Sequence, residues 1–262
     1  MAFRYGLPSV RQQRNKVFDM RKNGRSSLEI RPIRITPNYT SNPTGSVLIE
    51  TGETKVLCTT SVEDGVPGWM RQQRHTRGWL TAEYSMLPGS SSDRVRRERI
   101  QTSGRTQEIQ RLIGRSLRGV MDLGLCPDKT FMIDCDVIQA DAGTRTASIT
   151  GAWVSLKLAV DRLMKEGRLQ HNPIRNQIAA IGVALKSGEL MVDPDYAEDS
   201  EADLDMNIVV CPGGEMMELQ GTGEGAVFSK DQVTNIIDAA FGSLEPVFEL
   251  QQLAADGELA EG

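Results

Sequence analysis

The chain has 262 residues, 39% hydrophobic and 25% charged, a composition typical of a globular protein with one large or two small domains. No apolar stretch approaches the roughly 20 residues that cross a bilayer. The arginine-containing N-terminus lacks the apolar segment of a secretory signal, so we do not expect one. An organelle transit segment is the less favoured alternative for these residues. The net charge of −5 is unevenly distributed, because residues 189–262 carry −17. Residues 71–118 carry +7 and contain 11 arginines. Such a local excess of arginine indicates a binding site for a polyanion.

The first third of the chain predicts an extension followed by a β-hairpin. Residues 1–19 show no periodicity, so we expect them to be flexible, which leaves both Met1 and Met20 open as the start of the protein. Two β-branched runs, at 46–50 and 55–60, then flank a turn that contains glycine. This pattern predicts a hairpin.

The middle of the chain alternates loops, helices and a strand. Residues 65–101 are rich in glycine, proline and arginine, and we expect mainly loops around a short segment at 79–87. Apolar residues at spacings of three and four predict a helix over 104–121. Strict alternation predicts a strand over 130–140, and a second helix is expected over 146–166.

The last third predicts further hairpins, at 178–192 and 203–220, each with a glycine-containing turn. The residues from Ser229 have capping-box spacing and open a helix that we expect to end at Pro246. Residues 251–262 are expected to be a loose acidic tail.

Hairpins mixed with helices predict an α+β fold, with mainly antiparallel sheets and helices packed between or over them. Residues 45–64 and 181–199 show a similar pattern of strands and turns, which indicates an internal duplication. We expect residues 20–250 to form a single domain. The cysteines have no CxxC spacing and are expected to be buried, reduced thiols in a cytoplasmic protein. They are Cys58, Cys126, Cys135 and Cys211.

The turn before the second predicted helix has the features of an anion site. Unpaired N–H groups at a helix N-terminus carry positive partial charge. Gly143 lets the backbone approach closely, Thr144 adds a hydroxyl donor, and Arg145 adds a bidentate fork for phosphate oxygens. The residues alone also fit a plain helix cap beside an incidental arginine. The GxxxxGK[ST] spacing of a Walker loop is absent.

A second cluster of arginines accompanies the first predicted helix. Arg105 stands at its start, and Arg111, Arg115 and Arg118 follow as a stripe along it. Together they would produce a concentrated positive field, although a solvated arginine-rich surface has the same composition. Stripe arginines also pair with acids on neighbouring elements, so we expect one of the stripe to be structural.

The acidic segment 198–205 is a candidate magnesium site. In strand phase Asp203, Asp205 and Asn207 share one face. A carboxylate pair supplies the hard oxygen ligands that Mg²⁺ prefers while it bridges to substrate phosphates. A solvated acidic loop is the alternative for the same residues.

Several chemistries are not indicated. His75 and His171 lie in no zinc-binding spacing, which disfavours zinc hydrolysis, and no GxSxG elbow or dinucleotide fingerprint is present. Anion sites, arginines and a magnesium site without a protein nucleophile are what phosphoryl transfer requires, because positioning and charge neutralisation do most of that work.

At these segments the sequence resembles bacterial ribonuclease PH, a family of phosphorolytic 3′→5′ exoribonucleases that also act as tRNA nucleotidyltransferases. The resemblance covers about residues 20–245 and implies a ribonuclease PH-type catalytic domain. The matching strings are 45–50, 78–88, 103–115, 133–141, 143–152, 198–200 and 205–207.

The resemblance implies an activity and its partners. The family attacks the 3′-terminal phosphodiester of RNA with inorganic phosphate and releases nucleoside diphosphates, mainly from tRNA precursors. It assembles as a hexameric ring built from dimers. Arg94 and Arg97 match basic loop positions implicated in RNA contact.

For the reaction itself, the resemblance implies that Arg105 and the turn 143–145 hold the attacking phosphate, and that Asp199 and Asp205 hold Mg²⁺. The catalytic set is then Arg105, Arg145, Asp199 and Asp205. Two rival hypotheses are a non-catalytic RNA-binding ring subunit of an exosome-like assembly and a hydrolytic nuclease. This catalytic set argues against the first, and the second needs more clustered carboxylates.

The sequence departs from the family at several points. Ala142 stands where the family usually has glycine, and Gly89 replaces an arginine that commonly contacts RNA. The loop 68–78 is longer and more basic. The extension 1–19 has no family counterpart.

Overall fold

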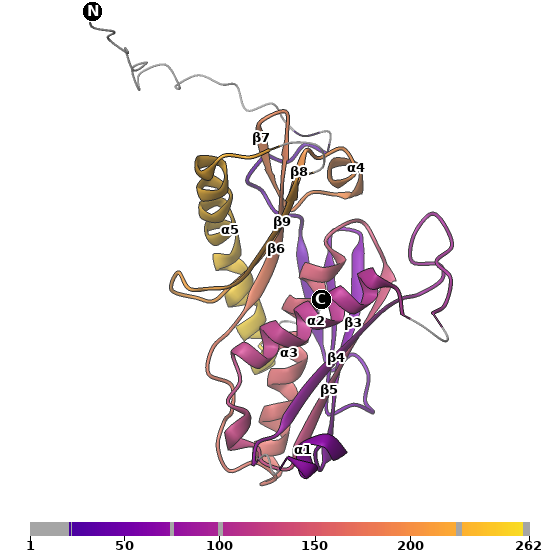
Figure 1. Ribbon diagram of the computed structural model, residues 1–262, viewed down its shortest axis with the longest axis vertical. Coiled ribbons are helices and arrows are strands. Elements are labelled where there is room, and N and C mark those ends of the chain that lie inside the picture. The colour runs from indigo at the N-terminus through magenta and orange to yellow at the C-terminus, as the bar shows by residue number, and fades with distance from the viewer. Residues whose placement is uncertain (1–20, 22, 74–75, 99–101, 224–226, 259–262) are drawn as a thin grey trace, which may run out of the picture.

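The computed structural model describes residues 21, 23–73, 76–98, 102–223 and 227–258, which form two β-sheets and the helices packed on them (Figure 1). The expected extension 1–19 and Met20 lie outside the described residues. Within that part of the chain, none of the helices has the length and apolar character needed to cross a membrane. In chain order the elements are β1 (Ile33–Pro37), β2 (Gly45–Thr51), β3 (Thr54–Asp64), α1 (Gly68–Gln72), β4 (Trp79–Met86), α2 (Gly104–Gly119), η1 (Leu123–Leu125), β5 (Lys129–Gln139), α3 (Thr144–Lys165), β6 (Ala179–Lys186), β7 (Glu189–Val192), α4 (Tyr196–Asp199), β8 (Leu204–Val210), β9 (Met216–Gly223) and α5 (Lys230–Asp256).

The two sheets confirm the predicted α+β class. The first sheet has the order β1-β2-β3-β5-β4, antiparallel except for the parallel pair β4 and β5. The second has the order β7-β6-β8-β9 and is antiparallel throughout. The predicted hairpins and the alternation along β5 are confirmed. The proposed internal duplication stays a prediction.

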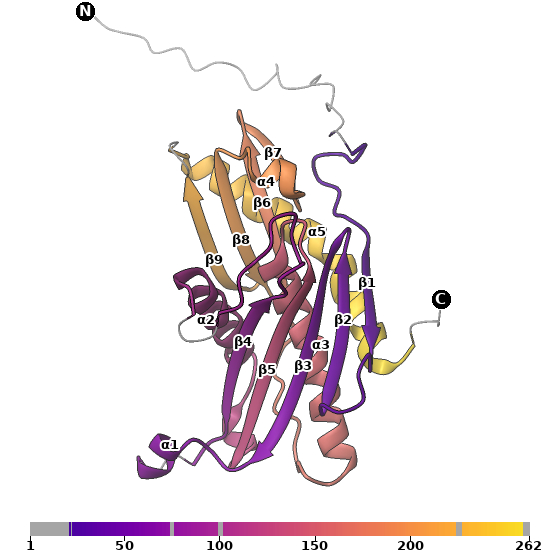
Figure 2. The ribbon, with the colours of Figure 1, turned by 90° about the vertical axis from the view of Figure 1, so that its right-hand side faces the viewer.

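Helix α3 lies between the two sheets and packs on strands of both (Figure 2). It is buried along most of its length, with small residues where strands approach closely. A Cβ on Gly151 would lie 2.7 Å from Ile49 Cγ2, and one on Gly45 would lie 2.0 Å from the carbonyl oxygen of Ser155. The absence of these methyl groups lets β2 and β3 pack directly against the helix, which fixes α3 relative to the first sheet.

Helix α5 corrects the expected end of the chain. We expected a helix that stops at Pro246 and a loose tail from residue 251, but α5 continues through Pro246 to Asp256 and ends at Gly257, which is left-handed with φ 73°. Val247 and Phe248 are buried against the second sheet. Each buried side chain of this size contributes about 1.5–3 kcal/mol, which offsets the roughly 3 kcal/mol that an interior proline costs.

The buried amide of Gln251 is what holds the last turns of α5. Its Nε2 donates to the carbonyl oxygens of Thr150 at 2.9 Å and Ile178 at 3.0 Å, and its Oε1 accepts from Gln177 at 2.9 Å. The side chain is fully buried. A residue expected to lie in a loose tail therefore bonds to α3 and to the chain that leads into β6.

We expect Gln251→Leu to destabilise the fold strongly, because each buried carbonyl left without a donor costs about 1–3 kcal/mol. Urea unfolding measures the loss. The matched control is Gln252→Leu, since Gln252 is exposed and its amide bonds only to the exposed Asp256; it should change stability by less than about 0.5 kcal/mol. Equal losses in the two variants would contradict the assigned role.

Candidate active site

A pocket of about 560 Å³ opens between the two sheets, beside the N-terminus of α3. Its walls come from the end of β4, the start of α2, the turn before α3, and the segment that leads from β7 to β8. Every residue that we predicted to bind phosphate or metal lines it. These residues are Arg105, Gly143, Thr144, Arg145, Asp199 and Asp205.

The turn before α3 takes an uncommon backbone path. Ala142 has φ 53° and Gly143 has φ 64°, so two successive residues are left-handed. Such a conformation strains alanine and suits glycine, and Gly143 is needed for a second reason. A Cβ there would lie 2.9 Å from Nη2 of Arg31.

Thr54 fixes this turn from the first sheet. Its hydroxyl donates to the carbonyl oxygen of Ala142 at 2.7 Å and accepts from the N–H of Asp141 at 2.8 Å. Gly143 is the N-cap of α3 and has no side chain to occupy the free N–H groups of the first turn. Those amides are therefore available to an anion, as an anion-binding helix N-terminus requires.

The polar side chains of this turn are held by neighbours. The Thr144 hydroxyl lies 2.8 Å from the hydroxyl of Tyr84, and both residues are buried. Arg145 Nη1 donates to Gln220 Oε1 at 3.3 Å and lies 3.6 Å from Glu108 Oε1. Because α2 and β9 supply these partners, the guanidinium is held at the pocket by both halves of the fold.

The two candidate metal ligands repel each other. Burial raises the pKa of Asp205, the charge of Asp199 raises it further, and Arg145 and Arg105 lower it in part. These charges therefore interact across one site. Within the described residues, no group of three histidine, cysteine, aspartate or glutamate side chains could hold a metal. A lone carboxylate pair nevertheless fits Mg²⁺, which takes one or two carboxylates and completes its shell with waters and substrate phosphates.

The predicted RNA-contact residues lie outside this pocket. Arg94 and Arg97 are exposed on the loop after β4, while Asp93 of the same loop lines the pocket. The loop thus leads from the surface to the mouth of the site. Gly89, which departs from the family, is also exposed there.

The arginine stripe of α2 contains the structural member that we expected. Arg118 donates to the carbonyl oxygen of Leu80 at 3.0 Å and lies over the ring of Trp79, 5.4 Å from its centroid. Arg115 pairs with Glu218 of β9. The cysteines are all buried and free, as predicted.

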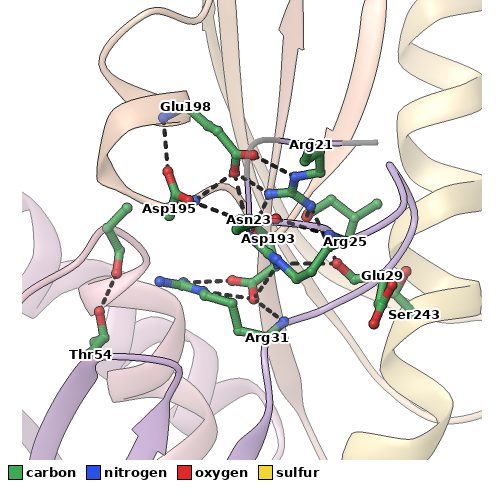
Figure 3. A network of polar contacts seen from close by, with 12 residues as sticks. Arg21, Asn23, Arg25, Glu29, Arg31, Thr54, Asp193, Asp195, Glu198 and Ser243 are labelled. Atoms are coloured by element: carbon green, nitrogen blue, oxygen red, sulfur yellow. Dashed lines mark hydrogen bonds and ion pairs between the residues drawn. The ribbon is translucent and has the colours of Figure 1, made fainter. Parts of the chain in front are cut away.

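Sequence reasoning missed residues that shape the pocket. Arg31 and Asp193 form a buried ion pair at 2.7 Å, and Thr54 secures the turn (Figure 3). Arg31 and Asp193 are 162 residues apart, so no local pattern connects them. An arginine before a β-branched run and an aspartate in an acidic stretch are each unremarkable alone.

Comparison with known proteins identifies the family. A model described as "3′ exoribonuclease family, domain 1" matches residues 29–160, and "3′ exoribonuclease family, domain 2" matches residues 176–243. The chain therefore belongs to the 3′ exoribonuclease family. It is an exoribonuclease of the ribonuclease PH type, which confirms the resemblance seen in the sequence.

The relatives are similar over nearly their whole length. Ribonuclease PH of Prochlorococcus marinus is 50% identical over 234 residues, covering 89% of this chain and 95% of the relative. Ribonuclease PH of Mycolicibacterium smegmatis is 50% identical over 249 residues, covering 92% and 95%.

Solved structures share the fold at lower identity. The archaeoglobus fulgidus exosome with RNA bound to the active site matches with a TM-score of 0.75 and 20% identity, over 88% of this chain and 92% of that one. Rice Rrp46 matches with a TM-score of 0.73 and 17% identity, over 90% and 100%. At these identities the likeness concerns the fold alone.

We expect Asp205→Asn to stabilise the folded chain at neutral pH. Because the pKa of Asp205 is raised on folding, its ionised form opposes folding above that pKa, and the opposition vanishes below the unfolded value of about 3.9. The melting temperature at pH 7 should rise by about 2–4 °C per kcal/mol relieved and converge with wild type in acid. Asp203→Asn, at an exposed neighbour, should give no such gain. A less stable Asp205→Asn would contradict the repulsion.

Proposed function

We propose that this enzyme shortens RNA from its 3′ end with inorganic phosphate as the attacking reagent, and that tRNA precursors are its main substrates. The observation that supports this most is the shared pocket. An anion-binding turn at 143–145 and Arg105 face it together with the carboxylates of Asp199 and Asp205. The cytoplasm is the expected location, since the buried free cysteines suit a reducing compartment.

In the proposed reaction, phosphate lies against the amides of 143–145, with Arg105 and Arg145 on its oxygens. One of its oxygens forms a bond to the terminal phosphorus while the bond to the preceding O3′ breaks and that oxygen takes a proton. The product is a nucleoside diphosphate. A magnesium ion bound by Asp199 and Asp205 supplies charge neutralisation at the scissile phosphate.

Arg145 adds a full positive charge to the partial charge of the helix N-terminus. Two anions must approach each other in the reaction, so the pocket has to neutralise both before they react. Arg145 is held by Gln220 and Glu108 before substrate arrives, and little reorganisation is then needed. Because one phosphate linkage replaces another, the reaction is near equilibrium, and the enzyme should also add nucleotides from diphosphates.

The alternative is a non-catalytic RNA-binding ring subunit of an exosome-like assembly. The pocket argues against it, since Arg105, Arg145, Asp199 and Asp205 all line the same cavity. The identity of about 50% to proteins called ribonuclease PH also favours the enzyme, whereas the exosome structures are about 20% identical. For the assembly we propose a hexameric ring of dimers, as the resemblance to ribonuclease PH implies. The chain shares its fold with a subunit of an archaeal exosome core.

Product identification tests the reaction. With a labelled 3′-extended tRNA, shortening should require phosphate and release nucleoside diphosphates, and Arg145→Ala should lower turnover by roughly 100- to 1,000-fold and raise the phosphate requirement. RNA binding should be spared. Arg162→Ala, at the exposed far end of α3 where it pairs with Glu166, is the control.

Two results would count against this function. Shortening that continues without phosphate and yields monophosphates would show hydrolysis. Loss of RNA binding in Arg145→Ala without any effect of phosphate would favour the binding subunit.

The exposed loop after β4 should contribute affinity for RNA through charge. We expect Arg94→Ala and Arg97→Ala each to weaken RNA binding and to reduce the slope of log Kd against log salt by up to about 1. The phosphate KM should not change. Arg175→Ala, which removes an exposed arginine paired with Asp122, is the control. An unaltered salt slope in the loop variants would exclude phosphate contacts by these residues.

A further inference from the structure

Behind the active-site pocket, a cluster of buried arginines connects the two halves of the fold (Figure 3). Arg31 enters from the segment before β1, and Asp193 from the segment after β7. Arg31 Nη2 donates to Asp193 Oδ1 at 2.7 Å, and its Nε and backbone N–H donate to Oδ2 at 2.9 and 2.7 Å. Both carboxylate oxygens are therefore fixed by one residue.

The same guanidinium also reaches the phosphate-binding turn. Its Nη1 donates to the carbonyl oxygen of Asp141 in a short hydrogen bond and lies 3.7 Å from the Asp141 carboxylate. Asp141 directly precedes the left-handed residues Ala142 and Gly143. Its carboxylate accepts in turn from the N–H of Tyr196, the first residue of α4, at 3.1 Å.

On the other side, the cluster holds the segment that carries Asp199. Arg21 and Arg25 each donate to the carbonyl oxygen of Asp193 at 3.0 Å. Arg21 Nε also donates to Glu198 at 2.6 Å, and the Glu198 carboxylate closes a capping box with Asp195. Glu198 is the neighbour of Asp199, so these bonds determine where α4 presents its last carboxylate.

The geometry of these contacts points to an interlock. We propose that the Arg31–Asp193 pair is a positioning device that sets the distance between the phosphate-binding turn 143–145 and the carboxylate of Asp199. This rests on the proposed function of the pocket. Asp193 lines the pocket and Arg31 does not; Arg31 acts through the backbone of Asp141 and through the segment that follows Asp193.

Position matters here because the two anions must meet in line, and a misplacement of about 1 Å can cost roughly 100-fold in rate. A guanidinium that donates to the turn and to Asp193 at once leaves neither free to shift alone. The planar fork of arginine is required for this, and lysine, as a single point charge, cannot reproduce it. The interlock therefore predicts an effect on phosphate that differs from simple loss of stability.

The first test uses inorganic phosphate alone as the probe. Titration calorimetry of the wild-type chain should detect phosphate binding, and Arg31→Lys should weaken it by roughly 10- to 100-fold, the effect of losing about one charge-assisted hydrogen bond. In turnover the same variant should both raise the phosphate KM and lower kcat, because a displaced phosphate binds less tightly and meets the scissile bond out of line. RNA affinity without phosphate should stay within about twofold. Gln251→Leu serves as control, because it destabilises the fold away from the pocket and should leave phosphate affinity unchanged.

A second variant separates positioning from stability. Arg31→Met combined with Asp193→Asn removes both charges of the pair, so neither partner stays buried alone. Arg25, which lies 3.6 Å from the Asp193 carboxylate, keeps Glu198 as a partner, and asparagine tolerates the left-handed φ of 50° at residue 193. We expect this double variant to regain melting temperature relative to Arg31→Met alone while phosphate affinity stays low, even though the Asp193 charge no longer opposes an anion in the pocket. Wild-type phosphate affinity in the folded double variant would overturn the interlock.

The interlock and the proposed function can fail separately. Release of monophosphates by the wild-type chain would refute phosphorolysis, yet calorimetry would still decide whether Arg31 controls the anion site. Diphosphate release with equal phosphate affinity in wild type and Arg31→Lys would refute the interlock alone. Absence of phosphate binding to the wild-type chain would refute both.

Discussion

The burial of α3 between two sheets is the constraint on which the rest of this structure depends. A helix that contacts strands on both sides must present small or apolar residues almost all round, and close approach by β2 and β3 is allowed because Gly45 and Gly151 have no side chains. The N-terminus of such a helix cannot drift. The amides of the first turn and Arg145 therefore lie between the sheets, in the same pocket as the carboxylates of Asp199 and Asp205.

This arrangement brings the basic and the acidic parts of the chain together at the pocket. The part before residue 189, which contains the arginine-rich segment, contributes the anion-binding turn and Arg105, and the acidic part from residue 189 contributes Asp199 and Asp205. Neither part holds a complete site. The hydrogen bond between Arg145 and Gln220 then ties the two parts together at the pocket itself. The family models likewise divide the chain into a first and a second domain, at residues 29–160 and 176–243.

Much of this could be predicted from sequence, because the signals were local. The hairpins, the apolar face of α2 and the strand-turn-helix around Gly143 follow from spacing, and the structure places every predicted phosphate and metal residue in one pocket. Their roles remain predictions. What sequence could not supply was long-range pairing. Arg31 and Asp193 carry no pattern, and their importance is visible only once the sheets are assembled.

The error at Pro246 has a similar cause. Proline disfavours a helix interior by a local rule, but the outcome depends on what the next turns bury, and that is decided by partners elsewhere. Gln251 reaches carbonyl groups on two other elements, which a reading of the last residues as a solvated acidic tail could not anticipate. Local rules thus described the elements well and their termini less well.

The repulsion between Asp199 and Asp205 has a consequence for the stability of the protein. The ionised form of Asp205 opposes folding, so a cation bound by the two carboxylates would stabilise the native state by mass action. The population of unfolded chains would then fall as the ion and substrate become plentiful.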